Sequence, residues 1–262
     1  MKTVREFMAA KASHEKIVIV TAYDAWSARL LADSPVDCLL VGDSVSMVVH
    51  GDRDTLGATI GLIALHTRAV ARGAPDKLII ADMPFLAGRK GTAYALDCAA
   101  KLVRAGAKAV KIEGLRGHAE VIRHLVDSGI PVMDHLGLQP QSINTVGGYR
   151  VQGRDEAAAA KLKDDSAKLE AAGAFSVLLE CIPAKLAREV TKSLSVPTIG
   201  IGAGAGCDGQ VLVLHDLLGF NPDFSPRFAR RFADGAGLVR KGVSRYAAAV
   251  RAGTFPRPKE SY

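Results

Sequence analysis

The sequence has few aromatic residues and no long apolar run. Aromatic residues make up 5% of the chain, and they form no stripe with lysine and arginine of the kind that nucleic-acid-binding surfaces carry. No apolar stretch approaches the roughly 18 residues of a membrane-spanning helix. Residues 1–16 are polar and lack the apolar core of a secretory signal. We therefore expect neither a nucleic-acid partner nor a membrane partner.

Cysteine is also scarce, and its spacing excludes two kinds of site. No pair has the C-x-x-C spacing of zinc or redox motifs, and each cysteine lies in an apolar run. Buried thiols without a disulfide framework are typical of a reducing compartment. We expect a cytoplasmic protein in which the four cysteines stay free, namely Cys38, Cys98, Cys181 and Cys207.

The remaining composition is that of a folded globular protein with a basic end. Of its 262 residues, 48% are hydrophobic and 23% are charged, which excludes a disordered chain. The formal net charge is +7, which by itself would suit an acidic partner such as a nucleic acid or membrane surface. From residue 217 onward there are nine basic and three acidic residues, so this region holds six of the seven net charges. We interpret it as a solvated helical face, with salt bridges to another subunit as the alternative.

Short apolar runs alternate with segments of helical spacing about eight times. The runs are rich in valine, isoleucine and leucine and lack a polar side, which is typical of strands buried on both faces. They are residues 17–21, 38–43, 78–82, 109–113, 131–135, 176–181, 196–202 and 210–215. Eight such units in about 250 residues predict a (β/α)8 TIM barrel, an α/β fold. A doubly wound open sheet is the alternative that the pattern leaves open.

The predicted barrel occupies the chain as a single domain, residues 1–262. No linker rich in proline or serine divides it. Residues 1–15 form an N-terminal lead, and residues 222–262 form basic C-terminal helices and a tail. The glycine-rich stretch 136–154 is long for a loop in a compact domain, and such loops are usually functional.

Carboxylates stand at the ends of four of the predicted strands. The last residues of the runs include Asp43, Asp82, Glu113 and His135, and Glu180 stands one residue before the end of its run. Barrel enzymes keep their chemistry at the carboxyl ends of the strands, and an unpaired buried charge is costly. Each acid could instead cap the following turn. Four together favour a site with hard oxygen ligands, which suits Mg²⁺.

Several neighbouring residues allow two interpretations. Lys111 lies two positions before Glu113, so both point to the same face, and Lys111 could bind an anionic substrate or form only a salt bridge. Ser44 could contact substrate or cap a turn, and His135 is more often a structural histidine. The glycines of residues 200–206 could approach a ligand or form a tight strand exit. The G-x-G-x-x-G pattern at 204–209 is rejected as a dinucleotide site, because a strand rather than a helix follows it.

At this point the motifs resemble a known family, that of ketopantoate hydroxymethyltransferase. The matching segments follow one another in order from about residue 17 to residue 220 and are together highly specific. They are TAYD at 21–24, VGDS at 41–44, ADMPF at 81–85, VKIEG at 110–114, HLGLQPQS at 135–142, GGYRVQG at 147–153, LECIP at 179–183 and GIGAG at 200–204.

The resemblance implies an activity, a fold subtype and a set of site residues. The fold would be a barrel of the phosphoenolpyruvate/pyruvate-binding type. The enzyme would transfer a hydroxymethyl group from 5,10-methylenetetrahydrofolate to 3-methyl-2-oxobutanoate, giving 2-dehydropantoate for pantothenate and coenzyme A biosynthesis. It also implies a cytoplasmic homo-oligomer, a decamer in bacterial members. The implied roles are Mg²⁺ binding by Asp43, Asp82 and Glu113, substrate binding by Asp43, Ser44, Asp82 and Lys111, proton acceptance by Glu180, and support by His135 and Tyr23.

Three positions depart from the family pattern, and one rival activity remains. Ser46 and Asp134 stand where the family usually has glycine, and Gly57 stands where it usually has proline. The departure at Asp134 puts the local geometry near His135 in question. The rival is another Mg²⁺-dependent lyase or mutase that acts on 2-oxo acids in the same barrel superfamily. A nucleic-acid-binding protein is the alternative from a different class.

Overall fold

Eight parallel strands close into a barrel in the computed structural model, which describes residues 1–222 and 226–262. Each strand pairs with the next along the chain, and β1 pairs with β8 to close the sheet. The strands are β1 (Ile17–Thr21), β2 (Cys38–Val41), β3 (Leu78–Asp82), β4 (Ala109–Glu113), β5 (Val132–Gly137), β6 (Ser176–Glu180), β7 (Thr198–Ile201) and β8 (Gly209–Leu212). The predicted (β/α)8 barrel is confirmed, and the open sheet is excluded.

The strand residues are buried on both sides, as their unbroken apolar runs predict. Every residue of β2, β3 and β4 is buried, including the charged ones. One face of each strand points into the barrel and the other lies under the helices, which is the arrangement of all-parallel sheets. Five strands differ from the prediction at one or both ends, and β6 differs least, since it ends at Glu180 instead of Cys181. β2 ends at Val41, β5 runs on to Gly137, β7 is shorter at both ends, and β8 ends before His215, which lies in a helix.

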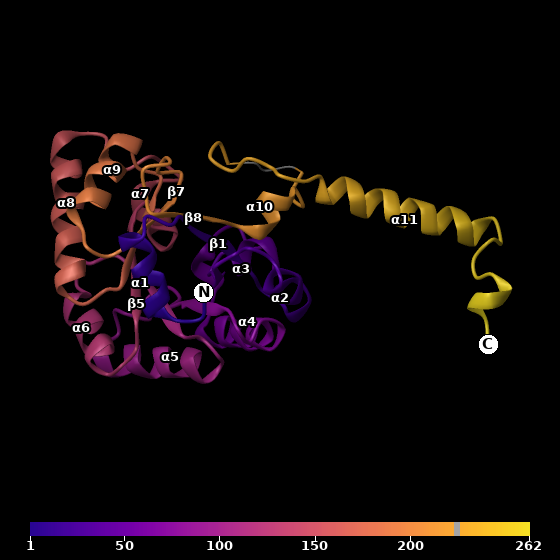
Figure 1. Ribbon diagram of the computed structural model, residues 1–262, viewed down its shortest axis with the longest axis horizontal. Helices are drawn as coiled ribbons and strands as arrows, with labels where there is room; N and C mark the ends of the chain where they lie inside the picture. The colour runs from indigo at the N-terminus through magenta and orange to yellow at the C-terminus, as the bar shows by residue number, and fades with distance from the viewer. Residues whose placement is uncertain (223–225) are drawn as a thin grey trace. The chain divides into compact units, whose positions relative to one another are not determined.

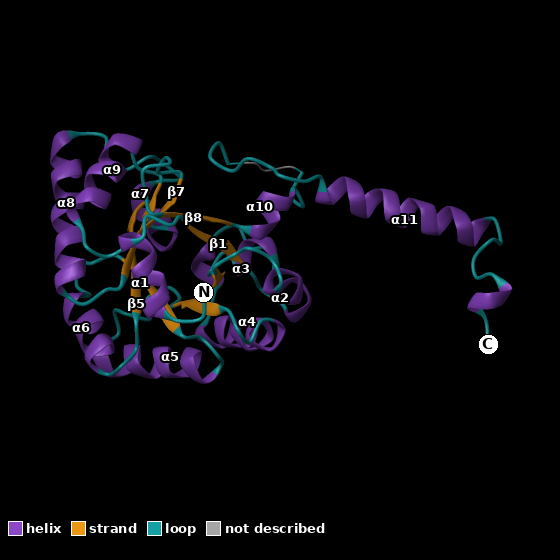
Figure 2. Cartoon of the chain, in the orientation of Figure 1, coloured by secondary structure: helices purple, strands orange, loops and turns teal. Residues whose placement is uncertain are grey.

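Helices follow the strands and form a ring around the barrel, as Figure 1 and Figure 2 show. Contacts between α2 and α4, α4 and α5, α5 and α6, α6 and α8, and α8 and α9 follow the order of the chain. The helices of the barrel unit are α1 (Val4–Ala12), α2 (Ala25–Ala32), α3 (Val45–Val48), α4 (Ile60–Gly73), α5 (Thr92–Arg104), α6 (Ala119–Asp127), α7 (Ile143–Val146), α8 (Glu156–Ala171) and α9 (Ala184–Ser193). Short 3-10 turns lie at Thr55–Gly57 and Pro140–Ser142.

The N-terminal helix closes the amino end of the barrel. Thr3 and Glu6 form a capping box that starts α1. Phe7 and Ala10 of this helix are buried in the cluster that fills the barrel between the strand starts. The ring of Phe7 meets that of Phe175 edge to face at 5.3 Å. The predicted N-terminal lead is thus a helix that seals one end of the barrel.

The chain divides into two compact units, Met1–Val213 and Leu214–Tyr262. The second unit holds α10 (Leu214–Leu218), α11 (Gly235–Arg251) and a 3-10 turn at Pro258–Glu260. The predicted C-terminal region begins within it, and residues 223–225 of that region lie outside the described residues. In the described part of the chain, no helix is both long enough and apolar enough to cross a membrane.

Candidate active site

The acids predicted from the strand ends gather at the carboxyl end of the barrel. Asp82 closes β3, Glu113 closes β4 and Glu180 closes β6. Asp43 follows β2 by two residues instead of ending it, and His135 lies inside β5 because that strand is longer than predicted. Since side chains alternate along a strand and the strands are adjacent, these groups meet in the barrel interior.

Lys111 of β4 lies at the centre of this acid cluster and is buried. Its ammonium is 3.1 Å from Asp82 Oδ2, 3.7 Å from Glu113 Oε1 and 3.4 Å from His135 Nδ1. Burial opposes a charge here, but the carboxylates of Asp82, Glu113 and Asp43 outweigh it and raise the pKa of Lys111. Lys111 is therefore a fixed positive charge among carboxylates.

Asp43 and Asp82 are neighbours in the cluster, and the ammonium of Lys111 does not compensate the negative charge of both carboxylates. The backbone N–H of Asp43 donates to Asp82 Oδ2 at 2.9 Å. Burial raises the pKa of Asp43 well above its usual range, and the nearby charges of Asp82 and Glu113 raise it further. Burial also raises the pKa of Asp82, although Lys111 counteracts this. Asp82 Oδ1 is buried and has no hydrogen-bond partner, so this oxygen is available to a ligand.

His135 lies between two carboxylates. Its Nδ1 is 3.4 Å from Glu113 Oε1, and its Nε2 is 3.2 Å from Glu180 Oε2. Burial and the charge of Lys111 both favour the neutral ring, but the contacts with Glu113 and Glu180 raise the pKa of His135 to about 9. This shift favours the protonated imidazole at neutral pH, which pairs by charge with both acids, although its Nε2 makes no hydrogen bond. These contacts place His135 beside the acid cluster.

The backbone around Glu180 holds its carboxylate at the rim of the cluster, where the side chain is 13% exposed. Cys181 directly follows it with a φ of 48°, a strained conformation for a residue other than glycine. Gly137 lies beside it on β5 with a φ of 90°, and a Cβ there would be 2.2 Å from the Glu180 carbonyl oxygen. Only glycine allows β5 to pass so close to Glu180.

Tyr23 and Ser44 form a hydrogen-bonded pair next to Asp43. The phenol oxygen of Tyr23 lies 2.8 Å from Ser44 Oγ. Tyr23 is 1% exposed, and burial raises its pKa, so the phenol stays neutral. Ser44 precedes α3 but makes no side-chain capping bond, which leaves its hydroxyl oriented by Tyr23.

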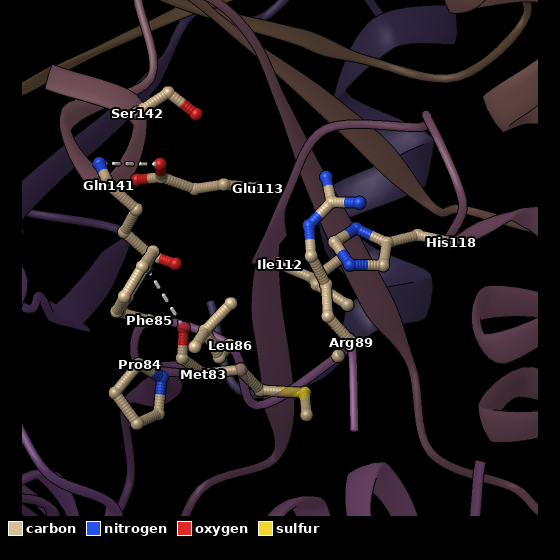
Figure 3. A pocket seen from close by; sticks show the side chains of 11 residues that line it. Met83, Pro84, Phe85, Leu86, Arg89, Ile112, Glu113, His118, Gln141 and Ser142 are labelled. Atoms are coloured by element: carbon tan, nitrogen blue, oxygen red, sulfur yellow. Dashed lines mark hydrogen bonds between the residues drawn. The ribbon is translucent and has the colours of Figure 1, made fainter. Parts of the chain in front are cut away.

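Gln141 was not among the predicted site residues, although it lies in a quoted motif. Its backbone N–H donates to Glu113 Oε2 at 3.0 Å, and its carboxamide donates to Asp43 Oδ2 at 2.8 Å and to the Met83 carbonyl at 3.0 Å. Figure 3 shows Gln141 reaching across between Glu113 and Met83. The only signal for it was the length of the loop after residue 135, which predicted a functional segment but no particular residue.

Two of the departures from the family pattern are neighbours in space. A Cβ at Gly57 would lie 3.8 Å from Ser46 Oγ and 2.6 Å from Asp52 Oδ2. The added hydroxyl at position 46 thus stands close to the position where a side chain is missing. Ser46 is buried, and its hydroxyl has no hydrogen-bond partner.

The third departure, Asp134, points away from the acid cluster. It precedes His135 on β5, so alternation directs it to the outer face of the strand. The residue is 0% exposed, and neither carboxylate oxygen has a hydrogen-bond partner. Burial raises the pKa of Asp134 to about 8. The side chain is therefore largely protonated at neutral pH and sits outside the barrel interior.

The glycine-rich run after β7 forms a tight strand exit. A Cβ at Gly204 would lie 2.5 Å from that of Ala184, so glycine lets this turn approach the start of α9. Gly209 then begins β8 rather than a helix, which agrees with rejecting a dinucleotide motif. His215, which the sequence placed at the end of the last strand, lies instead in α10.

A cavity of about 750 Å³ adjoins the acid cluster. Gln141 and Ser142 line it, as do Gly137 at the end of β5 and Arg89. The recess in Figure 3, about 30 Å³, shares Phe85, Arg89, Gln141 and Ser142 with it and also reaches Glu113. The site therefore has a small polar recess at the acids and a larger chamber beside it.

The cluster offers hard oxygen donors but no ready-made metal cage. Four carboxylates, of Asp43, Asp82, Glu113 and Glu180, meet one ammonium and one imidazole. Among the described residues, no three His, Cys, Asp or Glu side chains are arranged so as to enclose a metal ion. Lys111 lies against two of the acids that would be ligands.

Comparisons with known proteins agree over the whole chain. A family model described as ketopantoate hydroxymethyltransferase matches residues 1–258. A 3-methyl-2-oxobutanoate hydroxymethyltransferase of Bdellovibrio bacteriovorus is 51% identical over 262 residues, covering 100% of both chains. Proteins of the same name from Francisella tularensis subsp. novicida and Coxiella burnetii are 45% and 48% identical, covering 100% and 96% of this chain and 99% and 95% of theirs.

Solved structures share the fold at low sequence identity. A 2,3-dimethylmalate lyase of the PEP mutase/isocitrate lyase superfamily has a TM-score of 0.62 at 18% identity, covering 100% of this chain and 92% of its own. A phosphonopyruvate hydrolase, solved as a complex with oxalate and Mg²⁺, has a TM-score of 0.64 at 14% identity, covering 99% and 93%. These likenesses support the barrel fold.

Proposed function

The chain belongs to the ketopantoate hydroxymethyltransferase family and is a transferase, and from that premise we propose that it moves a hydroxymethyl group from 5,10-methylenetetrahydrofolate to 3-methyl-2-oxobutanoate. The product would be 2-dehydropantoate, for pantothenate and coenzyme A biosynthesis. The observation that carries the proposal is the 51% identity over 262 residues to a relative of that name. The rival lyases and mutases share only the fold, at 18% identity or less in the comparisons above.

The charge of the cluster supports a divalent cation at Asp43, Asp82 and Glu113. Four buried or nearly buried carboxylates stand against only two positive groups, and Asp82 Oδ1 has no partner. Mg²⁺ prefers oxygen ligands, takes one or two carboxylates and keeps several waters, so an incomplete protein cage suits it. When bound, the ion would act as a Lewis acid on the keto group of the oxo acid.

Lys111 and Ser44 would hold the oxo acid beside Asp43 and Asp82. The Lys111 ammonium is a buried positive charge, which attracts the negative charge that develops on the keto oxygen during enolisation. Tyr23 holds the Ser44 hydroxyl next to Asp43 by its 2.8 Å hydrogen bond. Both groups are fixed before substrate arrives, so little reorganisation is needed in the transition state.

Glu180 would act as the general base at C3 of the oxo acid. Its carboxylate takes the C3 proton, and the electrons of the broken C–H bond form the enolate. The C–N10 bond of the folate breaks and N10 takes up a proton, which leaves the methylene as an iminium on N5, and the enolate carbon attacks that methylene carbon. Water then replaces N5 on this carbon, so that its oxygen becomes the new hydroxyl group and tetrahydrofolate leaves. Glu180 stands at the cluster rim, within reach of a substrate held by Lys111. His135 Nε2 lies 3.2 Å from its Oε2 and forms an ion pair with it when the imidazole is protonated.

A direct assay tests the proposed function. Purified protein is incubated with 3-methyl-2-oxobutanoate, 5,10-methylenetetrahydrofolate and Mg²⁺, and 2-dehydropantoate is measured by mass spectrometry. We expect product only when all three are present, loss of turnover with EDTA, and recovery when Mg²⁺ is restored. Turnover that persists after metal removal would reject the cation site, and absence of product would reject the reaction.

We also propose a cytoplasmic homo-oligomer, the decamer that the family resemblance implies. The four cysteines are free, as expected in a reducing compartment. In α11, Val239, Val243, Tyr246 and Val250 recur at coiled-coil-like spacing and are exposed. An apolar stripe of this kind supports contact with another subunit. Light scattering on the full chain measures the assembly, and a monomer would contradict it.

A further inference from the structure

The oxo acid alone does not account for the large cavity beside the acid cluster. Its volume of about 750 Å³ lies within the roughly 300–1,000 Å³ of small-molecule sites. The oxo acid has only five carbons and would be held at the acids themselves. On the proposed function, the second substrate is a reduced folate, which is far larger and combines a pterin, an aromatic ring and a glutamate.

Two guanidinium groups line this cavity and are free to bind an anion. Arg89 follows β3 and Arg116 follows β4, and Arg89 Nη1 donates to the Arg116 carbonyl at 2.7 Å. In the part of the chain that the structure describes, neither is paired with a carboxylate. The other charged residues that line the cavity, Lys161 and Asp165, form an ion pair with each other. The cavity therefore carries a surplus of two positive charges.

The rest of the lining is apolar and amide-rich. Leu115, Leu136 and Leu162 line the cavity and are buried, with 8%, 4% and 7% exposure. Such side chains suit the flat face of an aminobenzoyl ring. Asn144 and Thr145 add polar groups that can meet the hydrogen-bonding edge of a pterin.

The cavity reaches the reacting groups through two residues. Gln141 lines it and also contacts Asp43 at 2.8 Å and Glu113 at 3.0 Å. Gly137 lines it too and is the strand partner of Glu180 in the β5–β6 register. A ligand in the cavity can thus bring a carbon atom to the base. Figure 3 shows Arg89 on the opposite side of the recess from Gln141 and Glu113.

We infer that this cavity binds the folate co-substrate, with Arg89 and Arg116 holding the carboxylates of its glutamate. The glutamate carries two negative charges, which match the two guanidiniums, and arginine binds carboxylates in a bidentate manner. The pterin end then lies toward Gln141 and the acid cluster, where the methylene carbon is needed. This inference rests on the proposed function.

The test removes the two guanidiniums and the glutamate separately. An Arg89→Gln/Arg116→Gln double variant and the wild-type enzyme are assayed with 5,10-methylenetetrahydrofolate and with 5,10-methylenetetrahydropteroate, which lacks the glutamate. We expect kcat/KM of the double variant to fall about tenfold to a hundredfold with the folate, because charged hydrogen bonds are lost. With the pteroate it should change by less than about twofold. The matched control is Arg123→Gln, an exposed arginine of α6 outside the cavity.

The outcomes separate this inference from the proposed function. Solvent deuterium exchange at C3 of the oxo acid needs no folate, so the double variant should exchange at the wild-type rate. If wild-type enzyme turns over the folate donor and the double variant keeps its kcat/KM, or loses it equally with both donors, the inference is wrong and the function stands. If wild-type enzyme exchanges deuterium but uses neither donor, the proposed reaction itself is wrong.

Discussion

The charges of the acid cluster in the barrel are buried, whereas those of the basic helix α11 are exposed. The barrel unit has almost no net charge, yet it buries Asp43, Asp82, Lys111 and Glu113 within contact distance of one another. The C-terminal unit holds most of the net charge of the chain, and its arginines on α11 are exposed. Net charge alone would therefore suggest a site in the C-terminal unit, whereas the candidate active site lies in the barrel unit.

The difference lies in the surroundings of each charge. Exposed charges are screened by water and salt, so their pairwise energies are small. Buried charges interact through a medium of low polarity, which is why the pKa of Asp43 and that of His135 shift strongly. Removing one member of such a cluster changes all the others.

The largest effect is expected from the base. Glu180→Gln should lower turnover by about 10²–10⁴-fold and abolish deuterium exchange at C3, because the amide cannot accept the proton. Exchange measured by NMR in D₂O reads this step directly, and oxo-acid binding should persist. Glu189→Gln, a change at an exposed acid paired with Lys163 on the surface, is the control and should leave exchange unchanged. Normal exchange in Glu180→Gln would remove Glu180 from the role of base.

The next effect concerns the central cation. Lys111→Met leaves the carboxylates around it uncompensated and should cost about 3–5 kcal/mol of folding free energy at neutral pH. Without the ammonium, the folded-state pKa of Asp82 rises further, so the variant should lose stability as the pH increases from 5.5 to 8. Thermal unfolding at both pH values measures this. Lys101→Met, an exposed lysine on α5, is the matched control, and equal losses in the two variants would contradict the contrast.

Asp134 and His135 are neighbours on β5 and are both buried, but the carboxylate of Asp134 has no hydrogen-bond partner. Asp134 therefore tests what burial alone does to a titratable group. Because the pKa of Asp134 is about 8 when folded and near 3.8 otherwise, the folded state holds this proton more tightly. Stability is therefore lost as the pH rises from about 4 to about 8. Asp134→Asn removes that loss, so its advantage in Tm over the wild type should grow with pH, and its gain in free energy of unfolding should reach a few kcal/mol at pH 9. A difference in Tm between the variant and the wild type that is the same at pH 5 and pH 9 would mean that Asp134 does not titrate in this range.

The smallest effect is expected on α11. Arg240→Ser and Arg245→Ser change exposed side chains, so the free energy of unfolding should move by no more than about 0.5 kcal/mol. Turnover should stay at the wild-type level. Chemical denaturation and the product assay measure the two quantities. A loss above about 1 kcal/mol that depends on protein concentration would show that these arginines pair with another subunit, and the contrast would then hold only for the monomer.

The sequence predicts much of this site because strand ends in a barrel converge. Asp82 and Glu113 close their strands as predicted, and Glu180 closes β6 one residue earlier than the predicted end of that strand. Lys111 points the same way as Glu113 because it lies two positions before it. Gln141 could not be predicted in this way, since it comes from a loop whose path follows no periodicity. The protonation of His135 was also beyond the sequence, because it depends on burial and on two acids from neighbouring strands.

The seal that Phe7 and Ala10 form at the amino end leaves the barrel with a single entrance. On the proposed function, both substrates and both products would pass through the same opening at the strand ends. A large second substrate that enters last would trap the smaller one behind it. On the proposed function we therefore expect an ordered mechanism in which the oxo acid binds first and its product leaves last.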